Sequence, residues 1–267
     1  MGVGETGLAV SAHVDISYRV TRHLDEDAMA VALEWLSAEE RARCARLALA
    51  NDRRDFIAAH ALLRHALSAH GHRDPREWVF IPDANGKPEL ASVPGERPQF
   101  AFNLSHSRGL VACVVARDVD VGIDVERVGS GTDIIDLARR HFSSAEVAEL
   151  ERCESGARAA RFTELWTLKE SYVKATGAGI LRGLDECAFT LGAASSLRFN
   201  PADTAQADAW QFALFEVLDY RLAVAVRDPA QSLITLRIHE AVGDDRRTGI
   251  EARLLRMSKE VGVAFGA

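Results

Sequence analysis

Three acidic side chains in the second half of the chain have the types and spacing of a metal site. Residues 119–126 read VDVGIDVE, in which apolar β-branched residues alternate with acidic residues or glycine. Because side chains of a β-strand alternate between its two faces, this pattern places Asp124 and Glu126 on one face, roughly 7 Å apart. Gly122 lies on the same face and is expected to leave it open beside the pair. Neighbouring carboxylates repel each other, and a divalent cation bound to their oxygens would offset that repulsion.

The third acidic side chain lies in a predicted helix. Apolar residues recur at helical spacing between Phe162 and Val173, and Lys169 and Glu170 fall within that apolar stripe. A Lys–Glu pair at such a position is expected to be partly buried, and buried charges require a partner or a metal ion. Two alternatives remain open on these patterns alone: a structural ion pair in the helix, and an amphipathic strand whose acidic face is simply solvated.

The sequence repeats itself weakly, and the repeat predicts which elements position these residues. Four pairs of segments recur in the same order: 37–40 and 143–146, 54–64 and 160–170, 99–102 and 211–214, and 114–118 and 224–228. The first pair has the Ser-x-x-Glu pattern of a helix capping box, and the last two pairs contain apolar runs typical of strands. We interpret the chain as an α+β fold of two similar halves, related by a pseudo-twofold axis.

The repeat also gives the boundaries of the two halves. The N-terminal half is expected to comprise residues 1–120 and the C-terminal half residues 121–228, with residues 229–267 as an extension of unassigned role. The unbroken apolar run 110–116 predicts a buried strand, and four prolines and two glycines predict a loop over 82–98. In the repeat, Lys169 and Glu170 align with Leu63 and Arg64, so only the C-terminal half has an acid there.

Composition and cysteine spacing narrow the possible functions. The chain has 32 basic and 39 acidic residues, a net charge of −7, which argues against a nucleic-acid partner because such proteins carry a basic excess. The sequence contains neither a run of about 18 apolar residues nor a signal-peptide pattern, so we expect no membrane contact and a cytoplasmic location. The four cysteines are widely spaced, which argues against a zinc site and against a disulfide framework.

Taken together, the motifs resemble the paired signature of the 4′-phosphopantetheinyl transferase superfamily in its long, Sfp-type branch. Residues 122–126 read GIDVE, and some forty residues later residues 166–174 read WTLKESYVK. Three shorter motifs also match in order: GKP at 86–88, FNLSHS at 102–107 and HFS at 141–143. The resemblance covers about residues 37–228. It implies a fold of two fused α+β halves, with the active site in the cleft between them, and a monomer.

The resemblance implies an enzyme that transfers the 4′-phosphopantetheine arm of coenzyme A to a serine of an apo acyl- or peptidyl-carrier protein, with release of 3′,5′-ADP. Mg²⁺, or Mn²⁺ in its place, would be held by Asp124, Glu126 and Glu170 and would bridge the diphosphate of coenzyme A. Glu170 is also a candidate to deprotonate the serine, directly or through metal-bound water. Lys169 and Lys174 would be cationic partners of the phosphates or of the carboxylates.

The resemblance also implies contacts with the nucleotide of coenzyme A, mostly from the N-terminal half. His106 would donate to a phosphate with Ser105 beside it, and Lys87 and Pro88 would border the adenine. Arg43, followed by Arg41, is the first choice for the 3′-phosphate. The chain departs from the family pattern at Glu40, where some relatives carry a basic residue.

One metal site is expected rather than two symmetric ones, because the aligned residues of the N-terminal half, Leu63 and Arg64, are not acidic. Two alternative functions remain open. One is a catalytically silent module that binds coenzyme A or carrier proteins, and the other is a different metal-dependent enzyme that cleaves a diphosphate on the same scaffold.

Overall fold

A computed structural model describes residues 11–83, 87–91, 99–129, 133–177, 184, 187–192, 195–241, 251–258 and 262–266. The helices are α1 (Glu26–Trp35), α2 (Ala38–Ala45), α3 (Ala50–Gly71), α4 (Ile134–His141), α5 (Ser144–Arg152) and α6 (Ser155–Thr176). The strands that precede α4 are β1 (Ser11–Val20), β2 (Phe80–Pro82), β3 (Pro88–Leu90), β4 (Ala101–Ser107), β5 (Leu110–Ala116) and β6 (Asp120–Arg127). The later strands are β7 (Cys187–Leu191), β8 (Leu197–Pro201), β9 (Trp210–Val217), β10 (Tyr220–Arg227), β11 (Leu233–Glu240), β12 (Arg253–Met257) and β13 (Gly262–Phe265).

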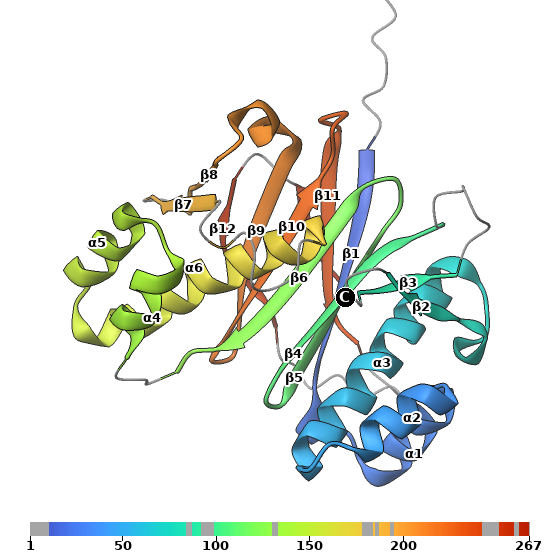
Figure 1. The fold of residues 1–267 in the computed structure, drawn as a ribbon. Coiled ribbons are helices and arrows are strands. Elements are labelled where there is room, and N and C mark those ends of the chain that lie inside the picture. Colours follow the sequence, from blue (N-terminus) through green and yellow to red (C-terminus); the bar gives the residue numbers. More distant parts are fainter. Residues whose placement is uncertain are drawn as a thin grey trace, which may run out of the picture.

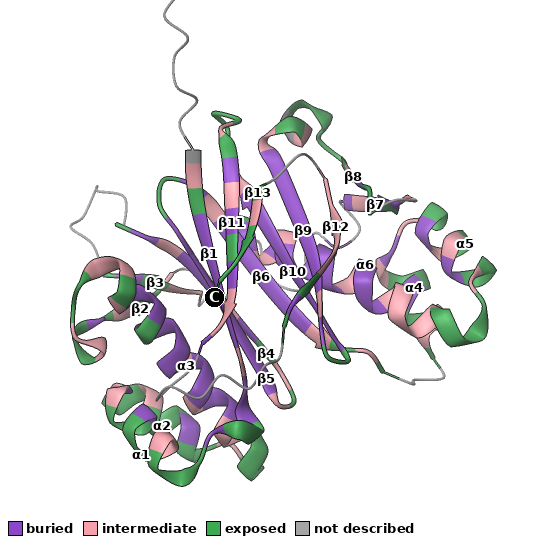
Figure 2. Cartoon of the chain, turned by 180° about the vertical axis from the view of Figure 1, so that it is seen from behind, coloured by how far each residue is buried: buried purple, intermediate pink, exposed green. Residues whose placement is uncertain are grey.

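Two sheets face each other in the middle of the molecule and helices cover their outer faces (Figure 1). The first sheet has the strand order β13-β11-β1-β5-β4 and the second has the order β12-β9-β10-β6. One apolar core lies between the sheets, a second lies between the first sheet and α3, and a third lies between the second sheet and α6. Figure 2 shows the result from behind: the central strands are mostly buried, whereas β2, β12, β13 and the outward faces of the helices are partly or fully exposed.

Strand β5 shows how the sequence produces these layers. Every residue from Leu110 to Ala116 is buried, which confirms the predicted buried strand. Leu110, Ala112 and Val114 belong to the core between the sheets, whereas Val111 and Cys113 belong to the core under α3. A strand buried on both faces needs apolar residues at every position, and the unbroken run supplies them.

The two halves have the same connectivity, and the α+β fold class is confirmed. In the first half β1 is followed by α1–α3 and the hairpin β4–β5, and in the second half β6 is followed by α4–α6 and the hairpin β9–β10. The leading strand pairs antiparallel with the second hairpin strand in both cases, β1 with β5 and β6 with β10. Capping boxes open α2 at Ser37 and α5 at Ser143. The division at residue 120 stays a prediction, and β6 begins at that residue.

A buried ion pair in each half corrects the helix alignment. Arg64 pairs with Glu40 at 2.7 Å, and Lys169 pairs with Glu146 at 3.0 Å. Both acids close the capping box of the preceding helix, and the two basic residues occupy the same position in α3 and α6, which have 22 residues each. Arg64 therefore corresponds to Lys169, and its expected alignment with Glu170 is wrong by one residue.

Two further segments differ from their predictions. In the segment 82–98, which was expected to be a loop, β3 pairs with β2 in a short antiparallel hairpin, and residues 84–86 and 92–98 lie outside the described residues. The C-terminal extension adds strands to both sheets: β11 pairs parallel to β1, β13 pairs parallel to β11, and β12 pairs antiparallel to β9. Within the described ranges, no helix is long and apolar enough to cross a membrane.

Candidate active site between the two halves

Asp124 is the central residue of the candidate site. It lies on β6, the edge strand of the second sheet, and it is only 3 % exposed. Its Oδ1 accepts hydrogen bonds from Ser105 Oγ (2.9 Å) and Lys174 Nζ (2.6 Å). Its Oδ2 is buried and has no hydrogen-bond partner among the described residues. A buried carboxylate oxygen without a donor is costly, so this atom is available to a hydrogen-bond donor or a cation.

Glu126 lies two residues further along the same face of β6. Ser107 Oγ donates a hydrogen bond to its Oε2 at 3.0 Å. Burial, and then the negative charge of Asp124, raises the pKa of Glu126 above its ordinary value. The two carboxylates thus stand together as the period of two predicts, and each has a serine of β4 as a hydrogen-bond donor.

Glu170 reaches the same place from α6. It is 5 % exposed, and its Oε1 is buried without a hydrogen-bond partner in the described part of the chain. Burial, and then the charge of Asp124, raises its pKa to about 7, with a smaller contribution from Glu126. Asp124 raises the pKa of both glutamates and Glu126 also raises that of Glu170, so the structure brings the three predicted acids together.

Gly122 allows α6 to approach β6 this closely. A Cβ atom at residue 122 would lie 2.1 Å from the carbonyl oxygen of Ser171 and 2.5 Å from the backbone nitrogen of Ala175. No side chain fits such a gap, so the close packing requires glycine. The expectation that Gly122 leaves its face open is therefore wrong: the backbone of α6 covers that position and thereby carries Glu170 towards Asp124.

Lys174 lies one helical turn after Glu170 and joins the two halves. Its Nζ donates to Asp124 Oδ1 and, at 2.9 Å, to Ser105 Oγ of β4. Its backbone carbonyl accepts a hydrogen bond from Lys87 Nζ at 2.8 Å. Burial lowers the pKa of Lys87, and the nearby Glu89 opposes that change. Lys87 thus reaches from the hairpin of the first half to the end of α6 in the second half.

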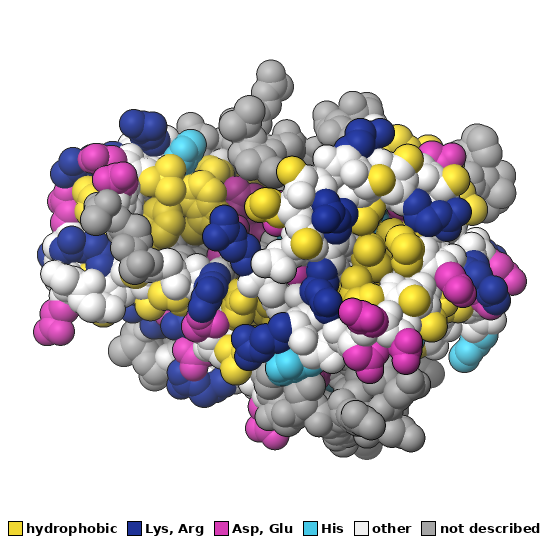
Figure 3. Space-filling model, turned by 90° about the horizontal axis from the view of Figure 1, so that it is seen from below, with side chains coloured by type: hydrophobic (Ala, Val, Ile, Leu, Met, Phe, Trp, Pro, Cys, Tyr) yellow, Lys and Arg dark blue, Asp and Glu magenta, His cyan; other side chains and the backbone are white. Residues whose placement is uncertain are grey.

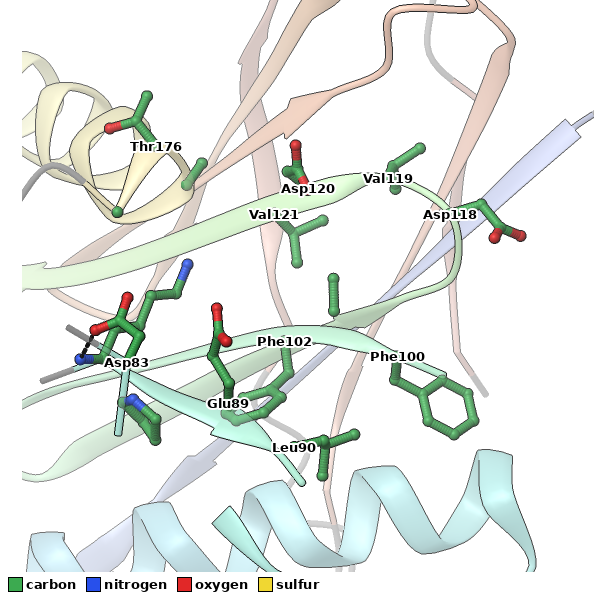
Figure 4. Close-up of a pocket in the computed structure, with 15 residues that line it drawn as sticks. Asp83, Glu89, Leu90, Phe100, Phe102, Asp118, Val119, Asp120, Val121 and Thr176 are labelled. Carbon is green, nitrogen blue, oxygen red and sulfur yellow. Dashed lines mark hydrogen bonds between the residues drawn. The ribbon is translucent and has the colours of Figure 1, made fainter. Parts of the chain in front are cut away.

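A pocket of about 400 Å³ lies between the halves beside Lys87 (Figure 4). The residues that line it come from the β2–β3 hairpin, from the start of β4, from the turn into β6 and from the end of α6, and they include Pro88. Phe100, Phe102 and Leu90 form an apolar part of the wall, and Asp83 and Glu89 point towards the space above them. Lys87 and Pro88 therefore border a cavity, and their contact with the adenine stays a prediction.

His106 lies on β4 between Ser105 and Ser107, so its side chain points to the opposite face of the strand, towards α3. Burial lowers the pKa of its imidazole below the ordinary value. Asp55 opposes that change, whereas Lys174 and His60 add to it. His60 was not predicted from the sequence: its ring centroid lies 4.2 Å from that of Phe56, and its Nδ1 lies 3.0 Å from Glu40. A lone histidine in an apolar helix carries no pattern that distinguishes it.

The two predicted arginines differ in their surroundings. The guanidinium of Arg43 lies over the ring of Phe56, 5.6 Å from its centroid, and the residue is exposed. Arg41 instead donates to the backbone carbonyl of Leu36 at the start of its own helix. Glu40 pairs with both Arg64 and His60. The acid that replaces the basic residue of some relatives therefore forms a structural ion pair here. Figure 3 shows Lys and Arg side chains gathered between the hydrophobic areas of the two halves.

The structure contradicts the catalytic assignment of Lys169. Its side chain is 0 % exposed, and its Nζ donates to the carbonyl oxygens of Leu184 and Cys187 and pairs with Glu146. Three acceptors satisfy the ammonium, which faces the α5 side of α6 and not the carboxylates on β6. Lys169 and Glu170 are neighbours in a helix, and the rotation of about 100° between them separates their roles.

The donor set fits a hard divalent cation. Asp124, Glu126 and Glu170 offer carboxylate oxygens, and two of these, Asp124 Oδ2 and Glu170 Oε1, are buried without partners in the described part of the chain. Mg²⁺ and Mn²⁺ prefer such oxygen ligands. Within the described ranges, no three His, Cys, Asp or Glu residues are already arranged to hold an ion. Lys174 bonds to Asp124, so cation binding requires these side chains to rearrange.

Two family models match the chain in succession. Residues 120–225 match the model described as 4′-phosphopantetheinyl transferase superfamily, and residues 24–118 match 4′-phosphopantetheinyl transferase, N-terminal. The 4′-phosphopantetheinyl transferase HetI of Nostoc is 34 % identical over 66 % of this chain and 71 % of its own length. The 4′-phosphopantetheinyl transferase psf-1 of Bacillus pumilus is 32 % identical over 73 % of this chain and 81 % of its own. Sfp of Bacillus subtilis is 28 % identical, over 57 % and 65 %.

Proposed function

Because this chain belongs to the 4′-phosphopantetheinyl transferase superfamily, we propose that it transfers the 4′-phosphopantetheine arm of coenzyme A to a serine of an apo acyl- or peptidyl-carrier protein, in a Mg²⁺-dependent reaction that releases 3′,5′-ADP. One observation carries the assignment to this site. Three carboxylates from β6 and α6 converge beside Lys174 at the junction of the halves, and two of their buried oxygens lack partners among the described residues.

The cation would be held by Asp124, Glu126 and Glu170. When bound, it would supply positive charge to the diphosphate of coenzyme A, on which negative charge builds up during transfer. The chain's own contribution is to hold three acids in a poorly solvated place where their repulsion favours cation binding. The raised pKa values of Glu126 and Glu170 report that repulsion together with the burial that strengthens it.

The transfer itself forms one P–O bond and breaks another. The carrier serine oxygen bonds to the phosphorus that bears pantetheine, while the bond from that phosphorus to the leaving oxygen of 3′,5′-ADP breaks. The proton of the serine must leave, and Glu170 is the candidate acceptor because one of its carboxylate oxygens is buried beside Asp124 without a partner in the described part of the chain. Lys174 offers an ammonium beside Asp124, where it would orient the diphosphate.

The remaining predicted residues would bind the nucleotide. Lys87 and Pro88 border the pocket between the halves, and His106 would donate to a phosphate; the charge of Lys174 reaches His106 and lowers its pKa. For the 3′-phosphate we retain Arg43 before Arg41, because the guanidinium of Arg41 donates to a backbone carbonyl whereas that of Arg43 lies over the ring of Phe56. Ser105 bonds to Asp124 and Lys174, so we place it at the acidic end of the site.

A monomer in the cytoplasm forms part of the same proposal. Both walls of the site come from one chain, so a second subunit is not required to complete it. Cys44, Cys113, Cys153 and Cys187 are all free, which suits a reducing compartment.

Mass spectrometry of a carrier protein tests the proposal directly. The protein is incubated with coenzyme A, Mg²⁺ and an apo carrier domain, and a mass gain of one phosphopantetheine arm on the serine is expected. Asp124→Ala is expected to abolish the gain, whereas Asp136→Ala is the matched control, since Asp136 is an exposed acid on α4. The absence of a mass gain with several carrier types, although coenzyme A binds, would refute the transferase assignment and favour a binding module.

A further inference from the structure

The two halves are joined at the site by side chains of β4 and not by a backbone ladder. β6 is the edge strand of its sheet and pairs with β10 along one side. Its other side faces β4, where backbone N–H groups need acceptors. Alternate β4 side chains provide them: Ile123 N donates to Asn103 Oδ1 (3.1 Å), Val125 N to Ser105 Oγ (3.2 Å) and Arg127 N to Ser107 Oγ (3.3 Å).

The two serines of this side-chain ladder also direct the carboxylates. A serine hydroxyl has one proton to donate and lone pairs to accept with. Ser107 accepts from the backbone of β6 and donates its proton to Glu126 Oε2 at 3.0 Å, while Ser105 does the same for Asp124 Oδ1 at 2.9 Å. Because the backbone bond fixes the position of each oxygen, the direction of each O–H group is fixed as well.

The C-terminal half shows that the fold does not require polar residues at these positions. β9 corresponds to β4, since Val217↔Tyr220 closes its hairpin as Ser107↔Leu110 closes the hairpin of β4. Counting back by two residues along each strand, Val217, Phe215 and Ala213 replace Ser107, Ser105 and Asn103, and all three are buried in the core between the sheets. The polar ladder is therefore a feature of the half that faces the carboxylates.

Ser107 has the clearer individual role of the two serines. Asp124 retains Lys174 if Ser105 is removed, because Lys174 Nζ bonds to the same oxygen. In the described part of the chain, Ser107 is the one side chain that donates a hydrogen bond to Glu126. Burial and Asp124 disfavour the charged carboxylate of Glu126, whereas Ser107 and the charge of Lys174 favour it. Among the described residues, only Ser107 adds a side-chain hydrogen bond, which has a direction and can fix the orientation of the carboxylate.

We propose that Ser107 is a positioning residue for the cation site: through its hydroxyl it holds the carboxylate of Glu126 in the orientation that binds the divalent cation. The inference rests on the proposed function, because it assigns the cation to these acids. The hydroxyl of Ser107 would contact the carboxylate that binds the cation, and it would not contact the cation. Outer hydrogen bonds of this kind typically change metal affinity by about 10- to 100-fold.

Mn²⁺ binding tests the inference without any transfer reaction. Free Mn²⁺ is measured by electron paramagnetic resonance during titration of the full chain with saturating coenzyme A and no carrier. We expect Ser107→Ala to raise the Kd for Mn²⁺ by about 10-fold or more, and Ser107→Thr, which keeps the hydroxyl, to stay close to the unsubstituted protein. Ser258→Ala is the matched control: Ser258 also accepts a backbone N–H bond, from Phe212, away from the acids.

The transfer assay supplies a second readout. Ser107→Ala should raise the Mg²⁺ concentration for half-maximal rate by a similar factor, with kcat at saturating Mg²⁺ nearly unchanged, which a loss of folded protein would not produce. The inference is overturned if Ser107→Ala binds Mn²⁺ within twofold of the unsubstituted protein, or if the unsubstituted protein binds none. Mn²⁺ binding that depends on Ser107, without transfer to any carrier, would instead refute the proposed function alone.

Discussion

The buried carboxyl of Glu170 should make the stability of the metal-free protein depend on pH. Burial and the nearby acids raise its pKa from an ordinary value of 4.5 to about 7. An acid whose pKa is raised by folding favours the folded state fully below its unfolded pKa and loses that effect as the pH rises through the folded value. The free energy of unfolding should therefore fall between about pH 4.5 and pH 7 on account of Glu170, and this contribution should stay constant above pH 7.

Glu170→Gln removes this effect, because an amide keeps the shape and cannot ionise. A tenfold change in proton affinity corresponds to about 1.4 kcal/mol, so a rise of the pKa from 4.5 to about 7 gives an upper limit of about 3 kcal/mol. Since Glu170 is only 5 % exposed, we expect most of that amount to be realised. In the absence of metal the variant should be more stable than the unsubstituted protein by about 2–3 kcal/mol at pH 8, and about equally stable at pH 4.5.

Urea unfolding in EDTA, followed by tryptophan fluorescence at pH 4.5 and pH 8, measures the difference. Glu34→Gln on α1 is the control, because Glu34 is exposed and should show no pH-dependent gain. Coenzyme A with Mg²⁺ should narrow the gap at pH 8, since a cation that binds the folded state stabilises the protein that retains Glu170. The reasoning fails if Glu170→Gln is no more stable than the unsubstituted protein at pH 8 in EDTA.

Two further substitutions test the packing that positions the site. Lys169→Met leaves Glu146 buried without its cation, so the free energy of unfolding at pH 7 should fall by about 3–5 kcal/mol in urea titrations; an unchanged midpoint would argue against a structural ion pair. Gly122→Ala places a Cβ atom 2.1 Å from the carbonyl oxygen of Ser171, so α6 must shift away from β6. Steady-state transfer by a still-folded Gly122→Ala protein should fall by about 100-fold, and normal activity would contradict the close approach.

Local patterns in the sequence were sufficient for the elements that carry the site. The alternation in 119–126 predicts β6 and the common face of Asp124 and Glu126, because a strand with one covered face imposes a period of two. The unbroken run 110–116 predicts β5, which is buried on both faces. The serines that open α2 and α5 are visible because a capping box is a contact within four residues. Each of these patterns reports an interaction that is local in the sequence.

Contacts between distant segments could not be predicted in the same way. Lys169 and Glu170 are adjacent and both fall in the apolar stripe, so the sequence does not show that one faces Glu146 and the other faces Asp124. The need for glycine at residue 122 also arises from another element, since the atoms it would meet belong to α6. Both features depend on which element packs against which face of α6 or β6. The pattern within one segment does not show which element that is.

The duplication explains why one cation site is expected and not two. By strand register, Ser17 of β1 takes the position of Asp124, because their partners Cys113 and Ala223 correspond. Arg19 likewise takes the position of Glu126, and His65, the residue after Arg64, takes that of Glu170. The first half thus presents a hydroxyl, a guanidinium and an imidazole where the second presents three carboxylates. A single cation site stays a prediction, and it now rests on Ser17, Arg19 and His65 in place of Leu63 and Arg64.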